Sequence, residues 1–185
     1  SPSFNSYVSQ ISDGWNFLAN PYHSVYDMQN QNLPGTYKTI YVWNGTTYKQ
    51  YNTHLDIGDD EARYLAPLQG FFLRTDSAQA AQGFDFDPAQ RVLNSTQGIQ
   101  KKAMPQFELH LRGGIHKQED HCYFMIHDQA LEAFELNKDA AKLPNAPDFP
   151  NLYSYAQEKE VAINVLPEAP LLQGIKIGFE ASEDT

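Results

Sequence analysis

Residues 39–51 read TIYVWNGTTYKQY, two runs of aromatic and β-branched residues on either side of Asn44-Gly45. Such runs favour strands, because branched and ring side chains pack well on a pleated, half-buried surface. Asn-Gly between two such runs is the strongest short-range hairpin signal, since both residues tolerate the positive φ of a type I′ turn. The stretch therefore predicts that Thr39–Trp43 pairs with Thr47–Tyr51 in an antiparallel hairpin.

A second hairpin is predicted where apolar and polar side chains alternate from Gln106 to Arg112. Alternation with a period of two puts every second side chain on the same face of a strand. One face receives Phe107, Leu109 and Leu111, and the other receives Glu108, His110 and Arg112. Gly113-Gly114 supplies the turn, and His121–Ile126 returns as the antiparallel partner.

The rest of the chain repeats the pattern of short strands between turn signals, at roughly the 8–12-residue spacing of sandwiches and barrels. Further strands are predicted at Trp15–Leu18, Tyr64–Leu68, Gly70–Arg74, Gln82–Phe86, Arg91–Asn94, Leu152–Tyr155, Glu160–Val165 and Ile175–Phe179. The apolar residues of Asp128–Ala141 fit a helical spacing only in part, so one short or irregular helix is expected there. The predicted fold class is all-β: an antiparallel, jelly-roll-like β-sandwich of one or two packed lobes, with at most one short helix.

Composition limits the classes of protein that the chain can represent. It has 185 residues, with 13 Lys plus Arg against 23 Asp plus Glu and a formal charge of −10. This length suits one domain or two small lobes that share one core. We place the lobes at 1–98 and 99–185, around a linker-like stretch at 95–105, and the alternative is that they pack into a single β-sandwich unit. The acidic balance argues against nucleic acid as a partner, and without a long apolar run no direct membrane insertion is expected. The single cysteine, Cys122, excludes an internal disulfide.

Several motifs occur in an order that resembles a known region of bacterial proteins. They are GWNFLANPY (14–22), IYVWNG (40–45), LAPLQGFFL (65–73), VAINVLP (161–167) and IGFEA (177–181). In this order they resemble a region of secreted and cell-surface Bacteroidetes proteins that commonly precedes a type IX secretion sorting domain. The chain departs from that pattern at His23, where the family usually has proline. Asp76-Ser77-Ala78 also resembles the acceptor of Bacteroidetes periplasmic O-glycosylation, which makes Ser77 a candidate glycosylation site.

The resemblance implies a β-sandwich fragment of a longer protein that is exported through the periplasm and secreted or held at the cell surface. It implies no activity, because such regions accompany peptidases, glycoside hydrolases and adhesins alike. We therefore expect a non-catalytic accessory, structural or adhesion module rather than an enzyme, with neighbouring domains of the parent chain as partners.

The alternative function is a carbohydrate-binding module whose ligand is a polysaccharide or another host or cell-surface molecule. Exposed rings would stack on the sugar faces. The candidate rings are Trp43, Tyr48 and Tyr51 on the first hairpin, with Tyr22 and Tyr26 after Asn20-Pro21. The competing interpretation of these aromatic residues is that they form the core.

No cofactor is expected for this chain, and the one candidate against that expectation is calcium, in the loop from Asp56 to Glu61. Asp56, Asp59, Asp60 and Glu61 place four carboxylates within six residues of a predicted loop. Oxygen-rich acidic loops hold calcium in extracellular proteins, although the spacing here departs from that of an EF-hand. The alternative is a solvated turn without a bound ion.

Histidines offer a second candidate metal site on the second predicted hairpin. If its strands pair as expected, His110 and His121 share a face, and the third ligand would come from Glu119 or Asp120. The spacing matches no known zinc motif. The alternative is a pair of surface histidines on an antiparallel ladder.

Overall fold

A computed structural model of the chain describes residues 4–8, 14–33, 35, 37–75, 82–92, 106–113, 118–168 and 174–181. The chain divides into two compact units, one formed by Ser1–Val42 and Lys49–Lys102 and the other by Trp43–Tyr48 and Ala103–Thr185. The tip of the Asn44-Gly45 hairpin belongs to the second unit, although the strands on either side of it continue into the first. Among the described residues, no helix has the length and apolar character needed to cross a membrane.

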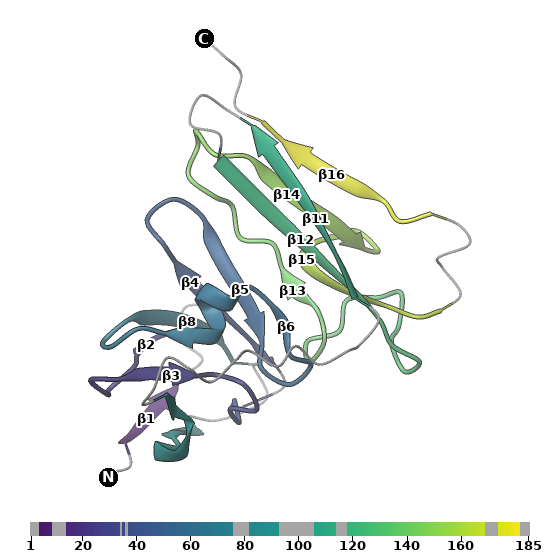
Figure 1. The fold of residues 1–185 in the computed structure, drawn as a ribbon. Coiled ribbons are helices and arrows are strands. Elements are labelled where there is room, and N and C mark those ends of the chain that lie inside the picture. The colour runs from purple at the N-terminus through teal and green to yellow at the C-terminus, as the bar shows by residue number, and fades with distance from the viewer. Residues whose placement is uncertain are drawn as a thin grey trace. The chain divides into compact units, whose positions relative to one another are not determined.

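The first unit contains three sheets of short strands (Figure 1). Two of them are small: β1 (Phe4–Val8) with β9 (Gln82–Phe86), and β10 (Arg91–Val92) with β3 (Val25–Asp27) and β7 (Tyr64–Leu65). The third has the order β2 (Trp15–Ala19), β8 (Gly70–Arg74), β4 (Thr39–Trp43), β5 (Tyr48–Asn52) and β6 (Ile57–Gly58). A single helical turn, α1 (Asp60–Arg63), and a 3₁₀ turn, η2 (Pro88–Gln90), complete the described elements of this unit.

Aromatic rings fill much of the core of the first unit. The buried cluster contains Tyr22, Tyr26, Met28, Leu33, Ile40, Val42, Tyr51, Ala62, Leu65, Phe71, Leu73, Phe84 and Phe86. Phe84 meets Phe86 edge to face at 4.6 Å between ring centroids, and Tyr22 stacks on Tyr26 at 5.8 Å. Such ring pairs add about 0.5–1.5 kcal/mol each to the gain from burying their area.

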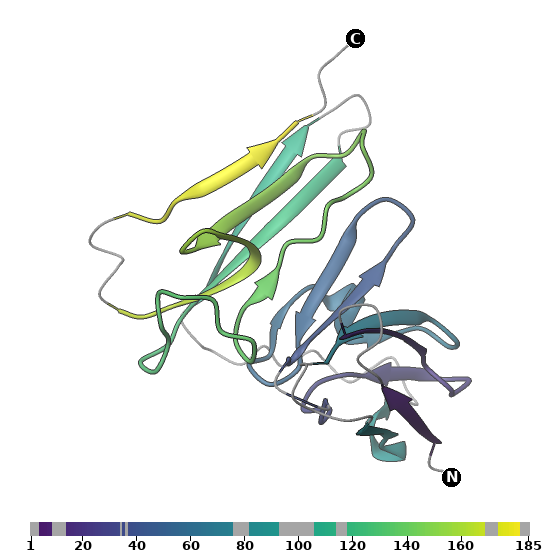
Figure 2. The same ribbon diagram turned by 180° about the vertical axis from the view of Figure 1, so that it is seen from behind.

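The second unit contains one six-stranded sheet, seen from the opposite side in Figure 2. Its order is β11 (Gln106–Gly113), β12 (Gln118–Ile126), β15 (Lys159–Leu166), β14 (Asn151–Ala156) and β16 (Ile177–Glu180), and β13 (Ala140–Ala141) also pairs with β15. β12 and β15 are parallel, which departs from the purely antiparallel arrangement that was predicted. A buried cluster of Cys122, Phe124, Leu152 and Leu166, joined by Leu111 and Ile175, lies within this unit.

The predicted all-β class is confirmed, since strands account for about 50% of the structure and helix for 6%. The prediction of a helix at Asp128–Ala141 is wrong, because that segment forms turns that lead into β13. Its carboxylates bind backbone groups instead: Asp139 accepts from the N–H groups of Glu135 and Val165, and Glu135 accepts from Leu131. Local bonds of this kind compete with those of a helix.

The Asn44-Gly45 hairpin forms, but with a different turn. β5 begins at Tyr48, one residue later than predicted, and of the two turn residues only Gly45 has a positive φ, of 102°. The Oδ1 atom of Asn44 accepts from the backbone N–H groups of Thr46 at 3.1 Å and Thr47 at 3.0 Å. The side chain of Asn44 thereby supplies the turn that a type I′ backbone would otherwise provide.

Candidate functional site

Three of the five aromatic residues predicted to bind sugar are core residues. Tyr22, Tyr26 and Tyr51 are buried in the first unit and unavailable for stacking on a ligand. Their hydroxyl groups donate inside the protein, Tyr22 to the carbonyl of Phe86 at 3.1 Å and Tyr51 to Asp56 at 2.6 Å. The correction has a physical reason: the sequence marks these residues as strand aromatics, and burial of a large ring with a satisfied hydroxyl is the more favourable outcome.

Trp43 and Tyr48 lie at the hairpin tip, where Trp43 is exposed and Tyr48 half-buried. Their ring centroids are 4.8 Å apart and their planes are inclined by 53°. The backbone N–H of Tyr48 donates to Oδ1 of Asn145 at 3.0 Å, which fixes this part of the tip within the second unit. The two rings therefore offer one exposed indole face with a tilted neighbour, not a flat platform.

The four carboxylates of the predicted calcium loop do not converge. Asp56 accepts from Nη1 of Arg63 at 3.0 Å, and Asp59 accepts from the backbone N–H of Gln50 at 2.9 Å and lies 3.7 Å from Nζ of Lys49. Asp60 and Glu61 are exposed in the first turn of α1. Two of the four charges are thus already balanced by cations of the chain, and the described residues do not bring three of these oxygens together as a ligand set.

Arg63 is the centre of this ionic network, which the sequence reasoning did not find. The buried guanidinium binds Asp27 through Nε at 3.0 Å and Nη2 at 3.1 Å, in addition to Asp56. Burial alone would lower the pKa of Arg63, but the hydrogen bonds and charges of Asp27 and Asp56 raise it. The carboxylates of Asp27 and Asp56 are therefore engaged by Arg63 within the first unit and do not form an open acidic site.

The histidine pair was predicted correctly in its register. On the β11–β12 ladder His110 stands directly opposite His121, and their ring centroids are 4.4 Å apart. The third member of this cluster is the acidic residue Glu108. Its Oε1 atom lies 3.3 Å from Nε2 of His110 and 3.1 Å from Nδ1 of His121. One ligand atom from each of these three residues lies within 4.8 Å of the others, which makes them the set of described residues that could hold a metal ion.

Neither residue first considered as the third ligand joins the set. Asp120 turns to the opposite face, where it is buried and paired with Lys142. Glu119 shares the face of the histidines but pairs with Arg112 at 3.3 Å, and its Oε2 is 3.9 Å from Nε2 of His121. Alternation along β11 places Glu108 two residues before His110 on the same face, and this signal was already present in the sequence.

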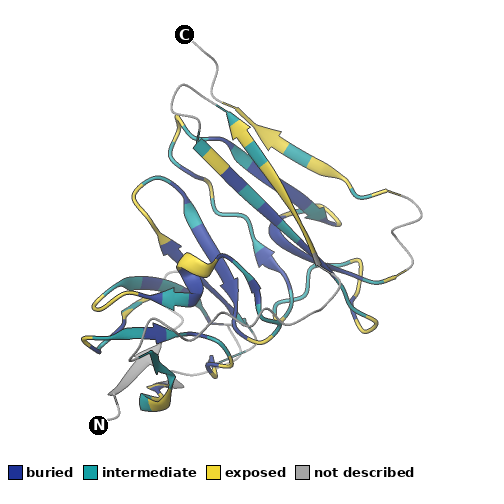
Figure 3. Ribbon diagram, in the orientation of Figure 1, coloured by how far each residue is buried: buried dark blue, intermediate teal, exposed yellow. Residues whose placement is uncertain are grey.

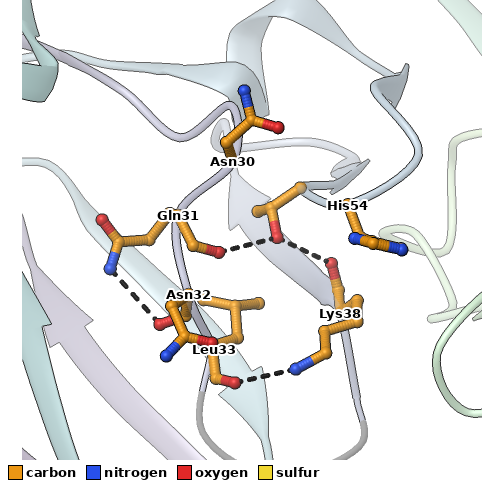
Figure 4. Close-up of a pocket in the computed structure, with 7 residues that line it drawn as sticks. Asn30, Gln31, Asn32, Leu33, Lys38 and His54 are labelled. Carbon is orange, nitrogen blue, oxygen red and sulfur yellow. Dashed lines mark hydrogen bonds between the residues drawn. The ribbon is translucent and has the colours of Figure 1, made fainter.

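A small cavity of about 150 Å³ lies beside residues 30–33 of the first unit, with Lys38, Thr53 and His54 (Figure 4). Burial lowers the pKa of Lys38, but its ammonium donates to the carbonyls of Leu33 at 3.0 Å and Gly35 at 2.9 Å. Pockets for organic ligands occupy about 300–1,000 Å³. This cavity is too small for a sugar ring. The ammonium of Lys38 is already hydrogen-bonded to two backbone carbonyls.

Cys122 has the properties of a packing residue. The side chain is buried, and burial raises the pKa of its thiol to about 12. The thiol therefore stays protonated at neutral pH and is a poor nucleophile. Ser77, the candidate glycosylation site, lies outside the described residues.

Comparison of the chain with protein-family models, with curated proteins and with solved structures finds no match. The architecture therefore defines its class: an all-β protein with two compact units.

Proposed function

We propose that the chain is a non-catalytic accessory module of a secreted or surface-anchored bacterial protein, and that its outer strands pack against neighbouring domains of the parent chain. The observation that carries this proposal is that large apolar side chains are exposed on the terminal strands of the described sheets. These are Phe17 on β2, Phe107 and Leu109 on β11, and Ile177 and Phe179 on β16. Figure 3 colours much of β11 and β16 as exposed.

An exposed ring on an edge strand places apolar surface beside unpaired backbone groups. An edge strand presents unpaired backbone groups, and proteins usually protect it with charges, proline or a short strand. Phe17 is 64% exposed and Phe179 66% exposed. Rings in such places favour contact with another protein surface.

The Phe17 ring is also held in place by its neighbours. Its centroid is 4.9 Å from that of Phe72. The ring lies over Gly70, where an added Cβ would come within 2.3 Å of Phe17 Cζ. A ring that is fixed at the surface loses little side-chain entropy when a partner covers it, which favours binding.

Other features support export and the absence of catalysis. The motif order resembles that of secreted Bacteroidetes regions, and the charge of −10 gives a strongly hydrated surface. Among the described residues, the half-buried carboxylate of Asp56 and the buried carboxylate of Asp120 are engaged by Arg63 and Lys142. Each of these two carboxylates is thus held by a cation of the chain rather than left free to act on a substrate.

The test uses the full-length parent protein and scanning calorimetry. Phe179→Ser and Phe17→Ser should each lower the melting temperature of the parent, because they weaken packing between this module and its neighbours. Leu131→Ser is the matched control, since Leu131 is 59% exposed but lies in the loop between β12 and β13 rather than on an edge strand. Equal effects of all three variants would contradict the role of the edges, and a parent protein found in the cytoplasm on fractionation would contradict export.

Carbohydrate binding is the second candidate, and it now depends on Trp43 and Tyr48 alone. Affinity gel electrophoresis with soluble polysaccharides tests it directly. The expected result is retardation of the chain that is lost in Trp43→Ala and kept in Phe17→Ser, which removes an exposed ring elsewhere. Equal mobility of the chain with and without every polysaccharide would exclude this function.

A further inference from the structure

We propose that Glu108, His110 and His121 form a binding site for a divalent transition metal ion, best fitted by Zn²⁺, on the exposed face of the β11–β12 hairpin. This site is additional to the accessory role and does not depend on it.

The first argument is the geometry of the three side chains. His110 and His121 face each other across the ladder, and Glu108 stands opposite Tyr123 one pair further along on the same face. The Glu108 Oε1 atom lies between the two imidazoles, 3.3 Å from one nitrogen and 3.1 Å from the other. Ligand atoms of a tetrahedral zinc ion with bonds of about 2.0–2.2 Å lie about 3.3–3.6 Å apart. The two distances from the carboxylate to the imidazoles are close to this range, and all three ligand atoms lie within 4.8 Å of one another, so the side chains have to rotate to close around the ion.

The second argument is the chemistry of the donors. Two imidazole nitrogens and one carboxylate oxygen are the ligands of His₂Glu zinc sites. Imidazole suits zinc, copper, nickel and iron, whereas calcium and magnesium prefer a shell made of oxygen atoms. The donor set therefore selects a transition metal and argues against calcium, the cofactor first suggested by the acidic stretch.

The third argument is the setting of His121. Its Nδ1 is directed at Glu108 and lies 3.3 Å from the hydroxyl of Tyr123, while its Nε2 is 3.9 Å from Oε2 of Glu119. When one imidazole nitrogen binds a metal, a carboxylate near the other fixes the tautomer and makes the ring a stronger ligand. Glu119 is the carboxylate nearest to that nitrogen, but at 3.9 Å it has to move closer to make the hydrogen bond, and it is itself paired with Arg112.

The fourth argument is the rigidity of the platform. β11 and β12 pair continuously from Gln106 opposite Met125 to Gly113 opposite Gln118. On the opposite face of the hairpin Phe107 stacks on the buried Phe124, with ring planes only 7° apart. Ligands on paired strands are held closer to a binding geometry than ligands on loops, which lowers the cost of ordering them.

Three protein ligands leave one tetrahedral position for water or for a group of a partner molecule. The site lies on an exposed face, since the side chain of His110 is 51% exposed. An ion bound there is therefore accessible from solvent.

Isothermal titration of the 185-residue chain with ZnCl₂ tests the proposal. The expected result is one Zn²⁺ per chain, with affinity that falls at least tenfold in His110→Gln and in Glu108→Gln. Both replaced side chains are exposed, so both variants should fold, which far-UV circular dichroism checks. His23→Gln, which removes an exposed histidine of the first unit, should bind as tightly as the unmodified chain. Excess CaCl₂ or MgCl₂ should displace none of the zinc.

Two results would overturn the proposal. One is the absence of stoichiometric zinc binding to the folded chain, which would mean that Glu108 only links the two histidines by hydrogen bonds. The other is stoichiometric binding that both His110→Gln and Glu108→Gln leave unchanged, which would place the ion elsewhere.

Discussion

Asp120 and Lys142 form an ion pair in the interior of the second unit, with their side chains only 2% and 4% exposed. The same oxygen of Asp120 accepts the backbone N–H of Leu152 at 2.6 Å. Asp120 lies between Glu119 and His121 in sequence, but its side chain is on the other face of β12. One carboxylate thereby ties β12 to the segment after β13 and to β14.

Lys142→Met should strongly destabilise the protein, because it leaves the carboxylate of Asp120 buried without a counter-charge. Breaking a buried pair in this way costs about 3–5 kcal/mol of the free energy of unfolding. Urea denaturation at pH 7 measures the loss. Arg112→Ala is the control, since it removes an exposed ion pair with Glu119 that contributes at most about 1 kcal/mol. A loss in Lys142→Met no greater than that of the control would refute the structural role of the pair.

Arg63 gives the corresponding prediction for the first unit. Arg63→Met leaves Asp27 and Asp56 uncompensated and should cost about 3–5 kcal/mol. Arg63→Lys keeps the charge but loses the two-pronged contact with Asp27, so its cost should lie between that of Arg63→Met and zero. Thermal unfolding followed by near-UV circular dichroism orders the variants. If Lys and Met prove equally disruptive, charge at this position contributes nothing measurable.

Strand positions could be predicted because they depend on local alternation and turn residues. β8 and β9 have the predicted bounds, and β11 pairs with β12 so that His110 meets His121 as expected. The helix expected at 128–141 failed because side-chain bonds of Asp139 and Glu135 competed with the backbone.

The candidate sites were harder to predict because they depend on partners far away in sequence. Nothing near Asp56 indicates that its oxygen binds Arg63, or that Arg63 also holds Asp27, which lies 36 residues before it. Which face of a strand is buried also decides whether Tyr51 is a ligand platform or a core residue, and strand alternation alone does not fix it. The alternation of strand side chains was enough to place Glu108 on the same face as His110. Its distances from the two imidazoles depend on the geometry of the β11–β12 pairing, which only the structure provides.

The ionisation of the Asp139 carboxyl should make the free energy of unfolding depend on pH. Burial is the main cause that raises the pKa of Asp139 to about 6, with Glu135 acting in the same direction and Lys138 and two backbone N–H groups acting against it. In the unfolded chain an aspartate titrates near pH 3.9. The folded state thus binds more protons between about pH 4 and 6. The stability contributed by this group is complete below pH 4 and is lost as pH rises through about 6, by roughly 3 kcal/mol in total.

Asp139→Asn isolates this effect because the amide stays neutral at every pH. The difference in free energy of unfolding between the unmodified chain and Asp139→Asn should shift in favour of the variant as pH rises from 4 to 7. Urea denaturation at each pH measures it, with the exposed Asp148→Asn as the control. A difference that is constant across this range would show that Asp139 is ionised in the same range in both states.

Substitution of Gly58 should be strongly destabilising, because its backbone has a positive φ and a side chain there would clash. Gly45 and Gly113 allow these two effects to be measured separately. Its φ is 124°, and an added Cβ would lie 2.2 Å from the carbonyl oxygen of Gln50 on the paired strand β5. Gly45 also has a positive φ but no atom within 4 Å of such a Cβ, and Gly113 has open space and an ordinary φ. Gly113→Ala should therefore change stability by less than about 0.5 kcal/mol. Gly45→Ala should cost about 1 kcal/mol for its backbone conformation, and Gly58→Ala about 2 kcal/mol more because backbone atoms must move. Chemical denaturation of the three variants ranks them, and equal losses in Gly45→Ala and Gly58→Ala would mean that β6 shifts away from β5 without cost.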